Sequence, residues 1–175
     1  MRRSDIEIMA PAGSWEALRA AIQGGADSVY FGVEKLNMRA RSSHNFTTAD
    51  LPEIVALCRK HGLKSYLTLN IVVFDEEINE MKEVLAAAAG AGITAVIATD
   101  QAAIIAARDA GIEVHLSTQL NISNAGSLEF YSRWADVAVL SRELNLQQVR
   151  TIYDAIIRND IRGPGGELMK LEMFV

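Results

Sequence analysis

Residues 113–121 read Glu-Val-His-Leu-Ser-Thr-Gln-Leu-Asn, and this stretch decides between the two folds that the sequence allows. Side chains along a β-strand point to opposite faces in turn. A strand over 113–120 therefore has one mainly apolar face and one polar face: Val114, Leu116, Thr118 and Leu120 against His115, Ser117, Gln119 and Asn121. The first face is suited to packing beneath a helix, and the second is not.

The same two-faced pattern recurs in other expected strands. Polar or half-polar side chains oppose aliphatic ones at Glu7, Tyr30, Tyr66, Asn70 and Glu172. An unpaired polar group buried under a helix layer costs about 1–3 kcal/mol. In a closed barrel the same groups face a shared lumen. The pattern therefore favours a barrel over the alternative, a doubly wound open sheet, whose strands are apolar on both faces.

Strands and helices alternate along the whole chain. Apolar runs predict strands over 6–9, 28–33, 64–71, 95–99, 113–120, 137–140 and 171–175. Amphipathic runs predict helices over 15–23, 48–60, 76–89, 102–109, 127–134 and 146–158. Glycines end several of these helices, as in Gly92-Ile93-Thr94 and Gly111-Ile112-Glu113. This is the βα repeat of parallel sheets.

The expected fold is an incomplete TIM-like (β/α) barrel of about six βα units plus a seventh strand. We expect one domain over residues 1–175. Because a complete barrel of this type takes about 250 residues and eight strands, we also expect the chain to be the N-terminal part of a longer protein.

Composition excludes several classes of protein. The chain has 17 Lys+Arg against 22 Asp+Glu, a net charge of −5, which argues against unspecific coating of nucleic acid or anionic membrane. Cys58 is the only cysteine, so no internal disulfide can form. No run approaches the roughly 18 apolar residues of a membrane span. A cytoplasmic protein with no membrane partner is expected.

The working residues of such barrels lie at the carboxyl ends of the strands and in the loops that follow. Amides, arginines and one tyrosine gather there, and we expect them to contact substrate: Tyr30, Asn37, Arg39, Arg41, Asn70, Gln119, Asn121 and Arg142. Arginine binds phosphates or carboxylates through two parallel hydrogen bonds. The basic loop over 34–46 therefore predicts a contact with an anion or RNA; a solvated loop is the alternative.

Catalytic residues are harder to assign. His115 is a candidate base with Ser117 and Gln119 as neighbours on the same face, although a core histidine with satisfied hydrogen bonds explains it as well. Glu143 is a second candidate, among the acids Glu7, Asp100 and Glu172. The chain contains no HExxH, Walker or GxGxxG motif, and we expect no metal site.

Five ordered segments together resemble one family: 7–14, 29–32 with 37–40, 67–70, 117–121 and 141–144, that is Glu-Ile-Met-Ala-Pro-Ala-Gly-Ser, Val-Tyr-Phe-Gly with Asn-Met-Arg-Ala, Leu-Thr-Leu-Asn, Ser-Thr-Gln-Leu-Asn and Ser-Arg-Glu-Leu. They are similar to the collagenase-like peptidases, family thirty-two of the peptidases of unknown catalytic type. The resemblance implies an incomplete or modified barrel. Some members are named proteases, and others take part in hydroxylation of transfer RNA, ribosomal RNA or a ubiquinone precursor.

The hydroxylating members hold an iron–sulfur cluster on four cysteines in their later half. This chain has only Cys58, so the resemblance implies no cofactor within it and a cluster, where present, on downstream cysteines. The expected function is that of an N-terminal barrel segment forming part of a substrate cavity. The full-length activity would be RNA hydroxylation or peptide hydrolysis, with RNA or a small anionic substrate as partner.

One alternative is not enzymatic. An incomplete barrel exposes a parallel strand edge on each side, and such edges invite pairing with another chain. The chain would then be a βα binding module that forms a homodimer through its open sheet edges.

Overall fold

In the computed structural model, which describes residues 6–36 and 46–175, seven strands form one sheet in sequential order, β1 to β7. All neighbouring strands are parallel. The strands are β1 (Met9–Pro11), β2 (Ser28–Phe31), β3 (Lys64–Leu69), β4 (Ala95–Ala98), β5 (Glu113–Leu116), β6 (Val137–Val139) and β7 (Lys170–Glu172). The helices are α1 (Trp15–Gln23), α2 (Leu51–Lys60), α3 (Ile78–Ala91), α4 (Gln101–Asp109), α5 (Ala125–Tyr131) and α6 (Leu146–Asn159), with short 3-10 helices η2 (Thr48–Asp50), η3 (Asp75–Glu77) and η4 (Thr118–Leu120).

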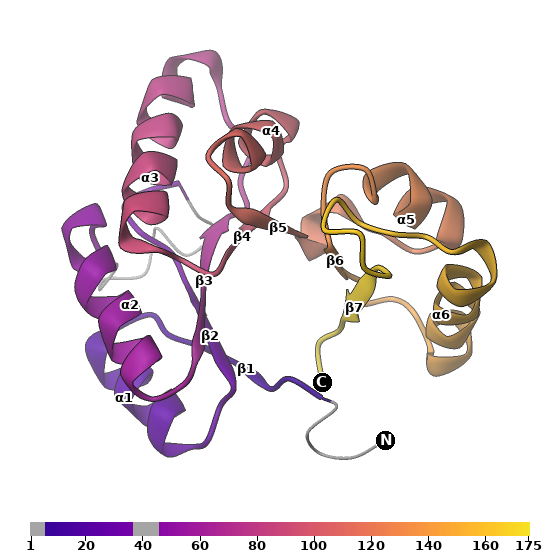
Figure 1. Ribbon diagram of the computed structural model, residues 1–175, viewed down its shortest axis with the longest axis horizontal. Coiled ribbons are helices and arrows are strands. Elements are labelled where there is room, and N and C mark those ends of the chain that lie inside the picture. The colour runs from indigo at the N-terminus through magenta and orange to yellow at the C-terminus, as the bar shows by residue number, and fades with distance from the viewer. Residues whose placement is uncertain (1–5, 37–45) are drawn as a thin grey trace.

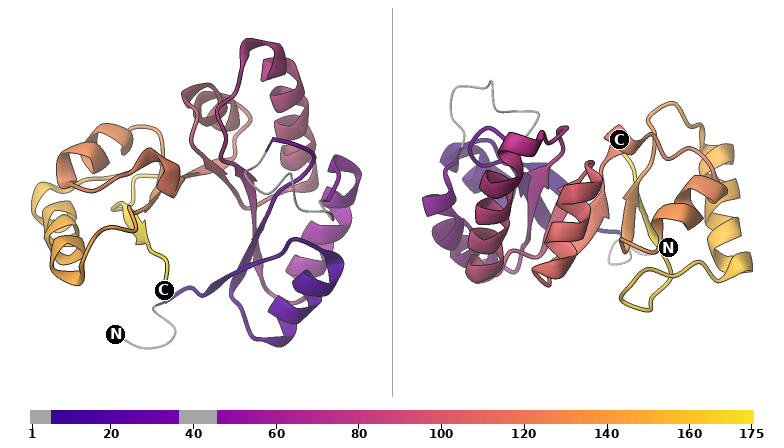
Figure 2. Two further views of the ribbon diagram at one scale, coloured as in Figure 1. Left: turned by 180° about the vertical axis from the view of Figure 1, so that it is seen from behind. Right: turned by 90° about the horizontal axis from the view of Figure 1, so that it is seen from above.

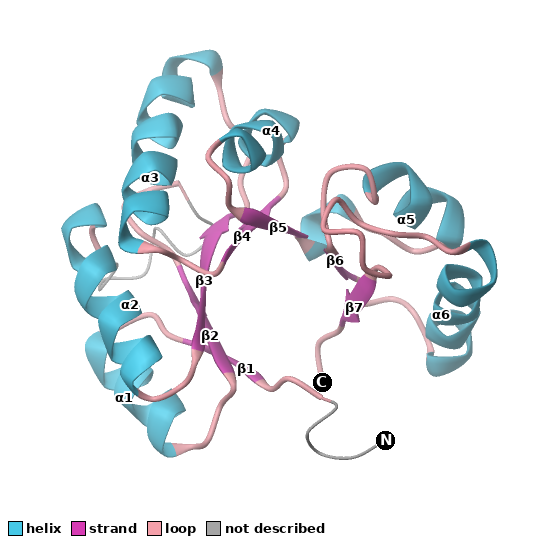
Figure 3. Ribbon diagram, in the orientation of Figure 1, coloured by secondary structure: helices cyan, strands magenta, loops and turns pink. Residues whose placement is uncertain are grey.

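The sheet curls into an arc with its helices on the convex side, as Figures 1 and 3 show. The views from behind and from above show the same arrangement (Figure 2). No strand pairing joins β1 to β7 within the described ranges, so these two strands are the edges of the sheet. The predicted incomplete (β/α) barrel is therefore confirmed. None of the described helices is long and apolar enough to cross a membrane.

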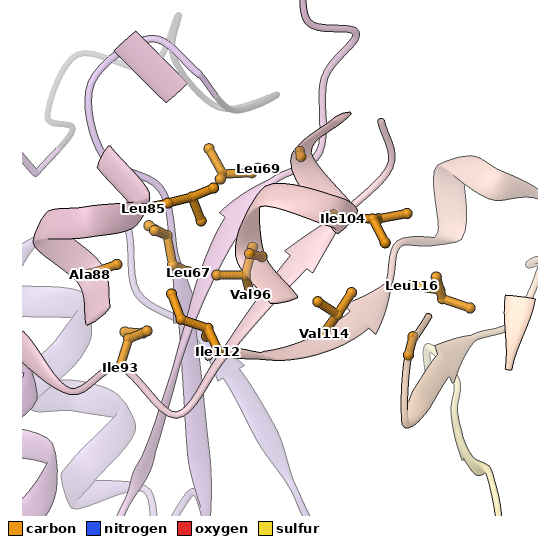
Figure 4. Packing of buried hydrophobic residues seen from close by; sticks show 14 of the residues in the cluster. Leu67, Leu69, Leu85, Ala88, Ile93, Val96, Ile104, Ile112, Val114 and Leu116 are labelled. Carbon is orange, nitrogen blue, oxygen red and sulfur yellow. The ribbon is translucent and has the colours of Figure 1, made fainter. Parts of the chain in front are cut away.

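The main core lies between the strands and the helices. Leu67, Val96 and Val114 point outward from β3, β4 and β5, and they pack against apolar residues of α3 and α4 such as Leu85 and Ile104 (Figure 4). All of these residues are at most 2% exposed. Burying one such side chain contributes about 1.5–3 kcal/mol. The outward face of the sheet thus holds the barrel wall together.

Local chemistry explains where the helices start and stop. The side chains of Ser14, Asn124 and Asn145 each accept a hydrogen bond from a backbone N–H of the first turn of α1, α5 and α6. Gly92 ends α3 in the left-handed conformation, with φ of 77°. Glycine adopts that conformation without the steric cost of a Cβ, so the chain can turn sharply from α3 into β4.

Each strand differs from its predicted bounds, by one residue or more, and the first and fifth differ for a local reason. The first strand begins at Met9, later than the predicted 6–9, because the Ile8 backbone N–H donates to the Asp27 carboxylate at 2.7 Å and not to the sheet. The fifth strand stops at Leu116, and residues 118–120 form η4. Asn121 closes that turn with φ of 53°, a left-handed conformation that asparagine tolerates better than most residues. The alternation expected up to residue 120 therefore ends four residues early.

Candidate functional site in the barrel lumen

The concave face of the sheet carries the polar side chains that the sequence predicted for it. Strand register places these lumen residues in rows: Tyr30, Tyr66, Ala95 and Glu113 in one, and Thr68, Ile97, His115, Val137 and Lys170 in the next. Tyr66 and Ile97 pack in a small cluster with Met9 and Tyr30, separate from the main core. The two faces of the sheet are thus chemically different, as a barrel requires.

Glu7 and Tyr66 meet on the lumen side. The Tyr66 hydroxyl donates to Oε1 of Glu7 at 2.5 Å, and Nζ of Lys64 donates to Oε2 at 2.6 Å. Burial raises the pKa of Glu7, but the hydrogen bonds from Lys64 and Tyr66 outweigh it and hold that pKa below its ordinary value. Burial, together with the bond to Glu7, raises the pKa of Tyr66. Glu7 is therefore a carboxylate, and Tyr66 keeps its proton.

His115 lies at the centre of the lumen face and is only 4% exposed. Its Nε2 lies 3.2 Å from Oε1 of Glu113, and its ring centroid lies 4.7 Å from that of Tyr66. The hydrogen bond with His115 lowers the pKa of Glu113 more than burial raises it. The other ring nitrogen, Nδ1, lies 4.0 Å from Oε2 of Glu172. It has no hydrogen-bond partner among the described residues.

Glu172 of β7 faces His115 from the neighbouring wall. Burial raises the pKa of Glu172 to about 7; the charge of Glu7 adds to this effect, and His115 opposes it. The side chain is 24% exposed, so it also reaches open space. Glu172 is thus a carboxyl group that exchanges its proton near neutral pH.

A hollow opens at the carboxyl ends of the strands, directly above this cluster. We call it the lumen pocket; it is lined by Tyr30, Thr68, Asn70, Ile97, Ser117, Thr118, Val139, Glu172 and Phe174. Thr68 donates to the backbone carbonyl of Phe31 at 3.0 Å, and Thr118 donates to that of Leu140 at 3.2 Å. These bonds orient the two hydroxyls, so the pocket wall is fixed by the strands beneath it.

A second hollow lies at the amino ends of β5 to β7, where Glu113, Asp136 and Lys170 are among its lining residues. There Oδ1 of Asp136 accepts the N–H of Gly165 at 2.8 Å and holds the turn before β7. Conserved function in (β/α) barrels resides at the carboxyl ends of the strands, and the opposite end serves stability. We therefore take the lumen pocket as the candidate site.

The structure brings together some of the predicted substrate residues. Tyr30 and Asn70 line the lumen pocket. The guanidinium of Arg142 lies 5.3 Å from the ring centroid of Phe174, which places it at the rim. Gln119 and Asn121 are exposed on and beside η4 and are not among the lining residues. Their contact with substrate stays a prediction.

Three predicted residues, Asn37, Arg39 and Arg41, lie outside the described residues. Glu143, a predicted catalytic candidate, is exposed and accepts a hydrogen bond from the Ser141 hydroxyl. That bond lowers its pKa. Asp100 instead caps α4, since its carboxylate accepts the N–H of Ala102 at 2.8 Å. Neither carboxylate lines the lumen pocket.

Sequence reasoning named Glu172 among the candidate acids but did not assign Thr68, Thr118 and Phe174 to the site. For Phe174 the signal was present, because it falls on a polar-facing position of the last expected strand. Thr118 was assigned to the opposite face, and this was wrong, because β5 ends at Leu116 and the chain turns.

The fit of a metal or cluster is tested by the ligands that the chain offers. Among residues 6–36 and 46–175, no group of three or more His, Cys, Asp or Glu side chains could hold a metal ion. Cys58 is fully buried on the outer side of the sheet, and burial raises the pKa of its thiol to about 11. As the only cysteine, it does not fit a four-cysteine iron–sulfur cluster. A cluster on downstream cysteines stays a prediction.

Fold and site together define a class: a parallel (β/α) barrel wall whose polar lumen opens into a pocket at the carboxyl ends of its strands. The family model of Peptidase family U32 matches residues 13–175. The chain belongs to this family.

Its relatives carry different functional names. A "Collagenase" of Porphyromonas gingivalis is 60% identical over 174 residues, covering 99% of this chain and 42% of the relative. "tRNA hydroxylation protein P1" of Bacillus subtilis is 33% identical, covering 86% of this chain and 36% of the relative. This chain thus spans less than half the length of either protein. The solved structure of the U32 peptidase Mk0906 aligns with a TM-score of 0.71 at 15% identity, covering 86% of this chain and 65% of that one.

Proposed function

We propose that this chain forms the substrate-holding barrel wall of a larger U32 enzyme that hydroxylates RNA. The observation that carries the proposal is the lumen pocket, where hydroxyl, amide and aromatic side chains converge beside the carboxyl group of Glu172, whose pKa is raised to about 7. Proteins that recognise RNA by its sequence bind unstacked bases. They stack these bases on aromatic rings and form hydrogen bonds with the base edges. Phe174 and Tyr30 supply rings for such a base, and Asn70 supplies an amide.

The charge distribution supports the same substrate class. The chain is acidic overall, so binding to RNA needs a local cation. Arg142 stands at the pocket rim against Phe174, where its guanidinium can pair with a phosphate beside the bound base. A relative that bears the name of a tRNA hydroxylation protein covers most of this chain.

Peptide hydrolysis is the second candidate, and the 60% identity to a protein named collagenase favours it. The geometry supports it less. Nucleophilic hydrolysis needs a hydroxyl or thiol within hydrogen-bond reach of a base. His115 instead contacts Glu113 through Nε2, and the Ser117 hydroxyl accepts the N–H of Gln119. Cys58 lies behind the sheet with a raised pKa.

The test is complementation with the full-length protein. Deleting its gene should remove a nucleoside heavier by one oxygen from digested tRNA or rRNA, measured by liquid chromatography and mass spectrometry. Wild-type protein and the surface control Asn79→Ala should restore that nucleoside. Asn70→Ala should restore at most about a tenth of it, because the site then loses a hydrogen bond to the edge of the base. An unchanged nucleoside profile after deletion, or full restoration by Asn70→Ala, refutes the proposal. Cleavage of gelatin by the same preparation, lost in Asn70→Ala, would establish the second candidate.

Association through the sheet edges remains the non-enzymatic alternative. β1 and β7 each pair with one neighbour in the described part of the chain. Size-exclusion chromatography across a concentration series tests it, because a dimer made by edge pairing dissociates on dilution and a monomer at every concentration contradicts it.

A further inference from the structure

The Nδ1 atom of His115 is a buried polar atom whose hydrogen-bonding capacity is not used by the described residues. The residue is 4% exposed, and Nδ1 makes no hydrogen bond within the described ranges. Its other nitrogen faces the Glu113 carboxylate at 3.2 Å. Nδ1 faces Oε2 of Glu172 at 4.0 Å, so the ring lies between two carboxyl groups.

The surroundings of Glu172 favour the protonated form of its carboxyl group. Glu7 contributes a negative charge from the segment before β1. Glu113 of β5 instead lies against Nε2 of His115, on the other side of the ring. Lys64 of β3 is engaged by Glu7, and Tyr66 keeps its hydrogen in the bond to the same carboxylate. On its own strand, Lys170 lies one row away, in register with Val137.

Glu172 also lines the lumen pocket, together with Val139 and Phe174. The hydroxyls of Ser117 and Thr118 lie on the same wall. One carboxyl group therefore connects the buried imidazole to the space where a substrate would sit.

We propose that Glu172 is the acid–base group of the lumen pocket and that His115 is its positioning residue. The proton on the Glu172 carboxyl passes to a carbonyl or hydroxyl oxygen of a polar substrate. The O–H bond to Glu172 breaks as the bond to the substrate oxygen forms, and the carboxylate is left facing His115. In the reverse direction the carboxylate takes a proton from a substrate hydroxyl. The assignment rests on the proposed function only in that the pocket must receive the substrate.

The experiment measures the protonation of Glu172 directly and needs no substrate. A water-soluble diazoamide esterifies carboxyl groups that carry a proton and releases nitrogen. Applied to the purified full-length protein between pH 5 and 9, its products are located by peptide mass spectrometry. At pH 7 a carboxyl group with a pKa near 7 is about half protonated, against roughly one part in five hundred for an ordinary glutamate. Glu172 should therefore react at least about tenfold faster than the exposed Glu129, even after allowance for its partial burial.

Two variants test the coupling. His115→Gln should move the midpoint of Glu172 labelling to higher pH, because the group that opposes the raised pKa is gone. Glu7→Gln should move it to lower pH, because a repelling charge is gone. Circular dichroism confirms that each variant is folded; if His115→Gln unfolds, Glu7→Gln decides alone.

Labelling of Glu172 no faster than that of Glu129, or a midpoint that a folded variant leaves in place, overturns the assignment. The nucleoside assay is independent of this result. Failure of RNA hydroxylation with labelling intact rejects the proposed substrate and leaves the acid–base pair standing.

Discussion

Replacing Glu172 with glutamine is expected to make the protein more stable at alkaline pH and to change little in acid. The pKa of Glu172 rises from its ordinary 4.5 to about 7 in the folded state. The folded state therefore binds this proton more tightly than the unfolded chain. The stability so gained is complete below pH 4.5 and is lost as the pH rises through 7. The difference between 4.5 and about 7 corresponds to about 3 kcal/mol.

Glu172→Gln removes the ionisable group but keeps its size. The expected gain in free energy of unfolding at pH 8.5 is about 1–3 kcal/mol. About 3 kcal/mol is the upper bound, because residual structure in the denatured chain and local water reduce the cost of burying the Glu172 charge. At pH 4 the variant and the wild type should agree within about 0.5 kcal/mol. Urea unfolding followed by circular dichroism, repeated from pH 4 to 8.5, measures the difference.

The control is Glu129→Gln on the exposed side of α5, which removes the same charge away from the lumen. Its effect should stay within about 0.5 kcal/mol at every pH. A stability difference for Glu172→Gln that is the same at pH 4 and pH 8.5 would refute the reasoning, since a cavity or packing effect does not follow the titration of one carboxyl group.

Three further predictions concern the outer wall of the barrel. Gly92→Ala should lower the free energy of unfolding by at least about 1–2 kcal/mol, because Gly92 has φ of +77° and an added Cβ would lie 2.2 Å from Nη2 of Arg59. Gly90 lies inside α3, and a Cβ added there would have no atom within 4 Å. Gly90→Ala should therefore raise the free energy of unfolding by about 0.5–1 kcal/mol in the same urea titration. Asn145→Ala should cost about 1 kcal/mol by the same measurement, since the N-cap hydrogen bond of α6 is lost. Cys58 should not react with Ellman's reagent at pH 8 until urea unfolds the protein, because the residue is fully buried and burial raises the pKa of its thiol to about 11; fast reaction of the folded protein would contradict this packing.

The barrel could be predicted because its signal is short-range and repeated. Val114 and Leu116 against His115 set the inner and outer faces of β5, and the same period of two recurs in β3 with Leu67 against Tyr66. Side-chain alternation is a property of the backbone and holds wherever a strand exists. The choice of a lumen over a second helix layer follows from the cost of burying those polar groups without partners.

The ends of strands were less predictable. Leu120 continues the apolar alternation of 114 and 116, so the pattern gives no sign that β5 stops at Leu116. The chain turns there because Ser117 caps η4 with its hydroxyl and Asn121 closes it in a left-handed conformation. Both residues stabilise turns through local hydrogen bonds that compete with the strand ladder. The error moved Thr118 to the wrong face.

Distances in the site could not be read from sequence at all. Polar parity placed Glu7, Tyr66, His115 and Glu172 on one face, yet it gave no reason to connect them. Their contacts depend on the curl of the sheet, which brings a segment before β1 to Tyr66 of β3 and brings β7 to β5. That curvature is the sum of many small strand rotations, and it is visible only in the folded chain.

In the lumen, the ionisable side chains and the apolar side chains come from different strands. In (β/α) barrels, each layer of inward side chains comes from alternate strands. Here β4 and β6 contribute Ala95, Ile97, Val137 and Val139 to the lumen face, whereas Tyr66, His115 and Glu172 come from β3, β5 and β7. Because Ala95 is small, the Tyr66 ring passes over it and meets His115 at 4.7 Å. A lumen packed for stability alone would carry branched apolar residues on every strand. Ionisable groups on three alternate strands, separated by small or apolar ones, instead form one line of neighbours that runs from Glu7 through Tyr66 and His115 to Glu172 at the pocket.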